Sequence, residues 1–205
     1  MDFCFFPLGQ PQPSTVRPHP GSAPFSIRTA TSDDLNDLAE ILAASFHSRT
    51  GWNRWLYPLL RLGIYEDLKH RFRSRNDHYI CLVAFYDVPT QNDPSHGTTI
   101  AGTVEMNLKT AFPWSVSSCQ YPYISNLAVR AQFRRQGIAR QLLLTCERVA
   151  QEWGYTTLYL HVLEDNDRAR QLYDRLGYRL HRTETPLFGK SKRLFLQKRS
   201  IGSTP

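Results

Sequence analysis

The sequence Arg134-Arg135-Gln136-Gly137-Ile138-Ala139 decides the fold, and it stands between an apolar run and a segment with helical periodicity. The apolar run, residues 124–129, is typical of a strand, and the periodic segment continues to Trp153. A short basic turn therefore opens a helix, where free backbone N–H groups and the positive end of the helix dipole attract phosphate. The stretch predicts a site for a ligand that carries a diphosphate.

Two common nucleotide-binding loops do not occur in the chain. Neither Gly-x-x-x-x-Gly-Lys-Ser/Thr nor Gly-x-Gly-x-x-Gly is found, so neither an NTPase P-loop nor a dinucleotide fingerprint can be argued. A second pattern lies further along and reads Asn166-x-x-Ala169-x-x-Leu172-Tyr173-x-x-x-Gly177-Tyr178. In series, the two patterns resemble the acetyl-CoA pyrophosphate loop and the helical tyrosine of the GNAT N-acetyltransferase superfamily.

This resemblance implies an α/β fold with a six- or seven-stranded mixed sheet. The sheet is expected to splay apart between the strand at Leu127 and the strand at Leu160, with the cofactor entering the gap. Periodicity and turn residues predict the elements in order. The expected strands are residues 25–28, 79–86, 100–108, 123–129, 156–162, 178–181 and 193–198, and the expected helices follow a capping box at Thr31 and Asp34 or cover 55–73, 137–153 and 167–176.

Length and charge limit the class of protein. With 205 residues and 41% hydrophobic content, the chain can bury one good core. We expect a single domain over 25–199, between a proline-rich tail (1–24) and a short tail (200–205). The net charge of +7 is scattered, which favours a solvated surface over a nucleic-acid site. No apolar stretch reaches the roughly 18 residues of a membrane span, so no membrane partner is expected.

The four cysteines, Cys4, Cys81, Cys119 and Cys146, stand far apart without a Cys-x-x-Cys pair. They indicate neither a zinc site nor a disulfide framework, so we expect no metal and a reducing compartment. A cytoplasmic location follows as the default. The plastid stroma remains the alternative, because the first 24 residues are poor in acids although Arg17 is their only arginine.

The resemblance implies that acetyl-CoA is held mostly by main-chain groups. The backbone of Leu127 and Val129 is expected to pair with the pantetheine arm as an added strand would, while the loop amides hold the pyrophosphate. A Cβ atom at Gly137 is expected to press on the phosphate. The cofactor-binding residues implied in this way are Leu127, Ala128, Val129, Arg134, Arg135, Gln136, Gly137, Ile138, Ala139, Arg140, Asn166 and Tyr173.

Transfer from a thioester to an amine requires a neutral amine and a proton donor for the departing thiolate. Deprotonation at pH 7 costs about 4.6 kcal/mol for a free lysine and about 1 kcal/mol for an α-amine. A weak base therefore serves an α-amine more easily. The superfamily pattern implies Tyr173 as the proton donor.

The base is indicated by Tyr123-Ile124-x-x-Leu127 and Tyr159-Leu160-His161-Val162, which resemble two strands of protein N-terminal acetyltransferase catalytic subunits. Our hypothesis is that His161 is the base and that Tyr123 orients a water molecule. The rival interpretation of His161 is a hydrogen-bonded structural residue. Glu105 is a second candidate base, although an acid on a half-exposed strand is more often solvated.

These patterns lead to an acetyl-CoA-dependent N-acetyltransferase that acts on a protein α-amine, a lysine ε-amine, or both. Asn126-Leu127-Ala128-Val129 and Leu160-His161-Val162-x-Glu164-Asp165-Asn166 resemble the plastid and cyanobacterial branch of the superfamily, which accepts both amines. The segment 50–55 lacks the substrate-peptide motif of N-terminal acetyltransferases, so the acceptor stays open. The alternatives are an enzyme of the same fold acting on a polyamine, amino acid or drug, and a catalytically silent acetyl-CoA-binding or nucleic-acid-associated protein. Monomer and homodimer both remain open.

Overall fold

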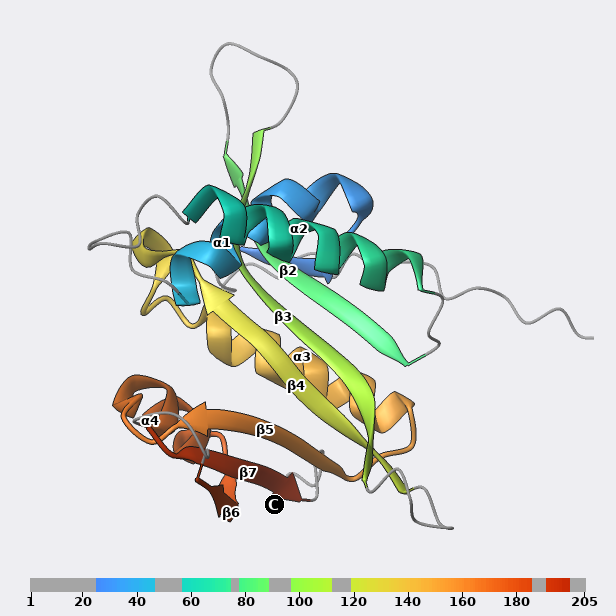
Figure 1. Ribbon diagram of the computed structural model, residues 1–205, viewed down its shortest axis with the longest axis vertical. Coiled ribbons are helices and arrows are strands. Elements are labelled where there is room, and N and C mark those ends of the chain that lie inside the picture. Colours follow the sequence, from blue (N-terminus) through green and yellow to red (C-terminus); the bar gives the residue numbers. More distant parts are fainter. Residues whose placement is uncertain are drawn as a thin grey trace, which may run out of the picture.

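The computed structural model describes residues 25–46, 57–74, 78–88, 97–111, 119–185 and 191–199. The expected tails and the segment 50–55 lie outside these residues. Figure 1 shows the elements in chain order. They are β1 (Ser26–Thr29), the 3-10 helix η1 (Ser32–Asp34), α1 (Leu35–Phe46), α2 (Tyr57–Arg73), β2 (Tyr79–Val88), β3 (Gly97–Ala111), β4 (Cys119–Val129), the 3-10 helix η3 (Ala131–Phe133), α3 (Ile138–Glu152), β5 (Thr157–Leu163), α4 (Asp167–Arg175), β6 (Arg179–Glu184) and β7 (Arg193–Arg199).

The strands form one seven-stranded sheet in the order β1-β2-β3-β4-β5-β7-β6. All neighbours are antiparallel except β4 and β5, which run parallel. This parallel pair is joined at only two positions, where Tyr123 faces Tyr159 and Ile124 faces Leu160. Beyond Ile124 the two strands separate (Figure 1). The expected mixed sheet and its splay at this place are therefore confirmed.

Helices cover both faces of the sheet, with α1 and α2 over one face and α3 over the other (Figure 1). The apolar stripe of α3 that the sequence predicts is confirmed, since Leu142, Cys146 and Ala150 are fully buried against the sheet. Cys81 is buried on the opposite face, and both thiols are free. Among the described residues, no helix is long and apolar enough to cross a membrane.

Several element boundaries differ from the expected ones. Strand β3 starts at Gly97, which pairs with Val88 of β2, and runs to Ala111, which pairs with Cys119, the first residue of β4. The pairing therefore continues beyond the apolar part of each strand. The polar ends of this hairpin carry no hydrophobic signal, so the sequence suggests a longer loop. Helix α2 starts at Tyr57 and passes through Pro58, which the first turn of a helix tolerates.

A β-bulge interrupts β4 at the point where it leaves β5. Glu105 pairs with Ser125 and Thr103 pairs with Ala128, so β4 has one residue more than β3 in this interval. Asn126 takes a left-handed conformation there (φ 53°). Its side-chain amide donates a 2.8 Å hydrogen bond to Glu105 Oε1. The bulge bends β4 away and so helps to open the gap.

Glu105 is not solvated, and the expectation from its strand position was wrong. The residue is only 2% exposed. Arg71 of α2 donates a 2.6 Å charged hydrogen bond to Glu105 Oε2, and the Tyr79 hydroxyl donates to the same oxygen at 3.3 Å. Both carboxylate oxygens are therefore occupied by donors within the protein, which makes Glu105 a poor candidate for the base.

Gly102 on β3 supports the close approach of β3 and β4 near the gap. A Cβ atom at this position would lie 2.9 Å from the carbonyl oxygen of Ala128 and 3.1 Å from Cγ2 of both Val129 and Ile138. We expect Gly102→Ala to destabilise the fold by about 1–3 kcal/mol through overpacking. The matched control is Gly63→Ala on α2, where an added Cβ meets no atom within 4 Å and helix propensity favours alanine. Thermal unfolding checks this prediction, and equal melting temperatures for the two variants would contradict it.

Candidate active site

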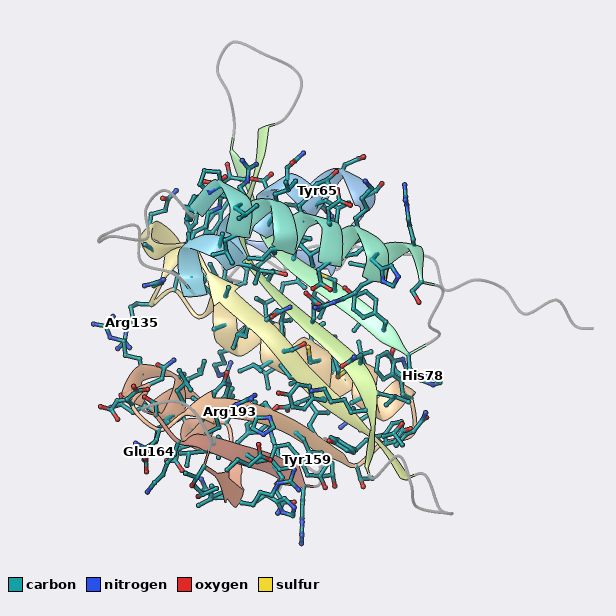
Figure 2. All side chains as sticks on the ribbon, in the orientation of Figure 1. Tyr65, His78, Arg135, Tyr159, Glu164 and Arg193 are labelled. Carbon is teal, nitrogen blue, oxygen red and sulfur yellow. The ribbon has the colours of Figure 1, made fainter. Side chains whose placement is uncertain are left out.

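The basic turn between β4 and α3 has the geometry of an anion site. Arg135 (φ 67°) and Gly137 (φ 83°) are both left-handed, and Gly137 is the N-cap of α3. Within the described part of the chain, the backbone amides of residues 135–140 donate to no carbonyl. Figure 2 shows the side chain of Arg135 pointing away from the body of the protein. The amides are therefore free for a phosphate.

The backbone conformation at position 137 requires glycine, because a φ of 83° would strain any residue with a side chain. A Cβ atom there would meet no protein atom within 4 Å. The protein leaves this space open, so the expected clash with a phosphate stays a prediction. The two residues that flank Gly137 are held by the protein. The Gln136 side chain accepts a hydrogen bond from Tyr86, and the Ile138 side chain is buried in the core, only 2% exposed.

The edge of β4 next to the gap offers main-chain groups for an extended ligand. Residues 125–129 pair with β3 on one side and have no partner on β5 on the other. Ala128 is buried, while Leu127 and Val129 are half-buried against the core. Arg134 Nε donates a 3.1 Å hydrogen bond to the Val129 carbonyl. The remaining edge groups fit the expected added strand, and the Arg134 contact is one that the sequence did not predict.

Tyr123 and His161 are brought together from neighbouring strands. The Tyr123 hydroxyl lies 2.8 Å from His161 Nδ1. The other ring nitrogen, Nε2, lies 3.0 Å from Glu184 Oε2. Because a carboxylate only accepts hydrogen bonds, Nε2–H donates to Glu184, and the lone pair of Nδ1 accepts from Tyr123. We call this chain of contacts the Tyr–His–Glu relay.

The electrostatics of the relay suit proton acceptance near neutral pH. Burial lowers the pKa of His161, Arg193 and Lys109 lower it further, and Glu184 opposes them. The imidazole is therefore neutral at neutral pH and free to accept a proton. Burial raises the pKa of Tyr123, so its hydroxyl keeps its proton until His161 takes it.

Tyr173 projects from α4 into the buried part of the protein and is 6% exposed. Burial raises its pKa to about 12, and Tyr123 is close enough to add to the shift through its charge. Its ring centroid lies 5.8 Å from that of Tyr178. Among the described residues, the Tyr173 hydroxyl has no hydrogen-bond partner. It is thus a protonated donor without an acceptor among the described residues.

Asn166 has a structural task that the sequence predicts. Its side-chain oxygen accepts a 3.2 Å hydrogen bond from the Ala169 amide and caps α4. Replacing such a cap costs about 1 kcal/mol. A contact between Asn166 and the cofactor remains a proposal. No group of three or more His, Cys, Asp or Glu side chains that could hold a metal occurs in the described residues.

Sequence reasoning missed three residues around the relay: Glu184, Lys109 and Arg193. Glu184 on β6 is 23 positions from His161 and reaches it across β7. The order β5-β7-β6 and the bulge between Leu180 and Arg182 set this contact. The pattern of neighbouring residues does not determine the order or the register of the strands. Only the resemblance to a known sheet could therefore have indicated that Glu184 lies next to His161.

Comparison with known proteins agrees with this geometry. The model of the acetyltransferase (GNAT) family matches residues 35–178. "GCN5-related N-acetyltransferase 10, chloroplastic" from Arabidopsis thaliana is 26% identical over 177 residues, which are 82% of this chain and 68% of that protein. The crystal structure of Arabidopsis thaliana NAA60 with a bisubstrate analogue has a TM-score of 0.63 at 21% identity and covers 87% of this chain and 99% of that one. The ribosomal-protein-S18-alanine N-acetyltransferase of Escherichia coli has a TM-score of 0.57 at 17% identity, covering 88% and 96%. The chain belongs to the GNAT acetyltransferase family.

Proposed function

We propose that this protein is an acetyl-CoA-dependent protein N-acetyltransferase that acts on α-amines, lysine ε-amines, or both. The observation that carries the proposal is the Tyr–His–Glu relay, whose Tyr123 and His161 lie on the two strands that separate to form the gap. Relatives support the acceptor class, since the NAA60 structure contains a bisubstrate analogue and the bacterial structure is named for a ribosomal protein. The name of the Arabidopsis relative supports the plastid stroma over the cytoplasm.

The residues present fit acetyl-CoA as the acetyl donor. The free amides of residues 135–140 and the open space at Gly137 suit its pyrophosphate. The unpaired edge of β4 suits the pantetheine arm. When bound, acetyl-CoA supplies an activated thioester. The exposed guanidinium groups of Arg135 and Arg140 add favourable charge near the phosphates.

The relay prepares the acceptor amine for attack. A proton leaving the amine, directly or through one water, passes to the Tyr123 hydroxyl as that hydroxyl gives its own proton to His161 Nδ1. Glu184 holds Nε2–H and stabilises the imidazolium that forms, as the carboxylate does in a catalytic triad. This extends the hypothesis from the sequence, in which Tyr123 orients a water molecule for His161. The low pKa of His161 suits an α-amine better than a lysine.

Tyr173 stabilises the leaving sulfur by donating a hydrogen bond. Its pKa of about 12 lies above that of a thiol near 8.5, so full proton transfer to a free thiolate would cost about 5 kcal/mol. Donation to the charge that develops on the sulfur requires no such transfer. A donor that is already in place and lacks another partner is effective in this role.

Glu184 gives a prediction about pH. It raises the pKa of His161 against the effect of burial, so Glu184→Gln should lower that pKa further. Since the relay needs neutral His161, the acidic limb of the kcat/KM profile should move to lower pH. The control is Glu152→Gln, an exposed residue on α3 on the opposite face of the sheet. If the acidic limb of the profile stays in place or moves to higher pH, Glu184 does not act on the pKa of the catalytic base.

The acceptor class is tested with three amines in parallel. One peptide has a free α-amine and no lysine, a second has a blocked N-terminus and one lysine, and the third substrate is spermidine. We expect acetylation of at least one peptide, with the α-amine peptide faster, and little of spermidine. Efficient acetylation of spermidine alone would overturn the proposal in favour of a small-molecule enzyme.

A further inference from the structure

Two cations, Lys109 and Arg193, stand beside the relay and form no ion pair with a carboxylate of the described residues. The Lys109 ammonium at the end of β3 lies 3.4 Å from the centroid of the Tyr123 ring. Arg193, at the start of β7, is close enough to Tyr123 to lower its pKa through charge and a hydrogen bond. Both residues are exposed, and neither forms an ion pair within the described part of the chain.

The carboxylates of Glu184 and Glu105 are already engaged. Glu184 binds His161 through Oε2 and Arg182 through Oε1, the latter at 2.8 Å. Glu105 is buried and paired with Arg71. Of the connecting segments, 47–56, 112–118 and 186–190 contain no aspartate or glutamate, and 75–77 and 89–96 contain one aspartate each. Among the described residues, no carboxylate forms an ion pair with either of these two cations.

The cations lie on an open face. Leu158, Leu160 and Val162 of β5 pack in the cluster that includes α3, so His161 lies on the other face of the sheet. The buried cluster beneath α1 and α2 on that face includes no residue of β5, β7 or β6. Figure 2 shows Arg193 and Tyr159 on these strands, and the stacking of Tyr159 on Phe195 places alternate β7 residues, Arg193 included, on the same face. Burial lowers the pKa of Lys109, Arg193 and Arg71 lower it further, and Glu184 opposes them. A ligand carboxylate would relieve this repulsion, whereas a polyamine would increase it.

We propose that Lys109 and Arg193 form an anion subsite that selects acceptor peptides with aspartate or glutamate at the second or third residue. The position of the acid in the peptide follows from its distance to the amine. The Lys109 ammonium lies on the ring of Tyr123, the tyrosine whose hydroxyl serves the amine, and an extended chain advances about 3.5 Å per residue. This inference rests on the protein N-acetyltransferase activity proposed above and adds its substrate preference.

The test compares peptides that differ in one charge. Each has a free α-amine, no lysine, and Asp, Asn, Glu or Gln at the second or the third residue. We expect kcat/KM to be about tenfold higher for the acid than for its amide. Lys109→Gln and Arg193→Gln should each reduce this ratio towards one. The control, Arg175→Gln, removes an exposed cation from α4 and should keep the ratio. A ratio cancels any general effect of a variant on turnover.

The outcomes separate the subsite from the activity. If the amide peptides are acetylated as well as the acid peptides, the anion subsite is wrong and the activity stands. If both variants still prefer the acid peptides, other groups bind the acidic side chain, and the assignment to Lys109 and Arg193 is overturned. If no peptide is acetylated, the α-amine part of the proposed function fails together with the subsite, and the lysine peptide described above tests the remaining part. A preference lost in both variants and kept in Arg175→Gln supports the subsite.

Discussion

Replacing Tyr173 with phenylalanine is expected to lower kcat by a factor of about 100 to 1,000, the usual effect of removing one donor to a developing negative charge. The ring stays in place, and it is 6% exposed and packed against Tyr178. Acetyl-CoA affinity should therefore remain near the wild-type value. Steady-state kinetics together with calorimetric titration of acetyl-CoA separates the two effects.

The matched control for this variant is Tyr178→Phe. It removes the hydroxyl of a second buried tyrosine that contacts the first ring, so it reproduces the loss of a buried hydroxyl without touching the gap. Turnover should change little in this control. If Tyr173→Phe kept kcat within about threefold of wild type, Tyr173 would be a packing residue and the leaving sulfur would need another donor.

The second large effect concerns His161. His161→Ala removes the proton acceptor of the relay and should lower kcat/KM for an α-amine peptide about 100-fold or more at pH 7. The defect should shrink as the pH rises above about 8, because the α-amine then loses its proton without help. A pH–rate profile of kcat/KM for wild type and variant measures both features.

The relay also predicts how its variants combine. Tyr123→Phe should impair the same step as His161→Ala, so the double variant should be little worse than the more damaging single one. His181→Ala is the control, since His181 packs on Phe195, as His161 does, and on Tyr159, and among the described residues it forms no hydrogen bond with Tyr123. Fully additive losses in the double variant would mean that the two residues act separately.

Local pattern was enough to predict most of the fold. The period of the apolar residues in α3, the glycine at its start and the cap at Asn166 are properties of neighbouring residues, and each is found where the sequence places it. The splay of the sheet was predicted only through the resemblance. It is seen in the two-residue contact between β4 and β5.

The remaining features depend on residues that are distant in sequence. The strand position of Glu105 alone predicts a solvated acid. In the fold, α2 places Arg71, 34 positions away in sequence, against the Glu105 carboxylate. Glu184 reaches His161 only because β7 lies between β5 and β6. The left-handed Asn126 and its bulge follow from the pairing of β3 with β4. Strand register and long-range ion pairs therefore had to be seen in the structure.

The most direct test follows a labelled acetyl group. The protein is incubated with acetyl-CoA carrying ¹³C in the acetyl group and with a peptide that has a free α-amine and one lysine, and mass spectrometry locates the label. We expect label on the peptide, mainly on the α-amine, with wild type, and at least about 100-fold slower labelling with His161→Ala or Tyr173→Phe. An unlabelled peptide in the presence of bound acetyl-CoA, or full labelling by both variants, would contradict the account.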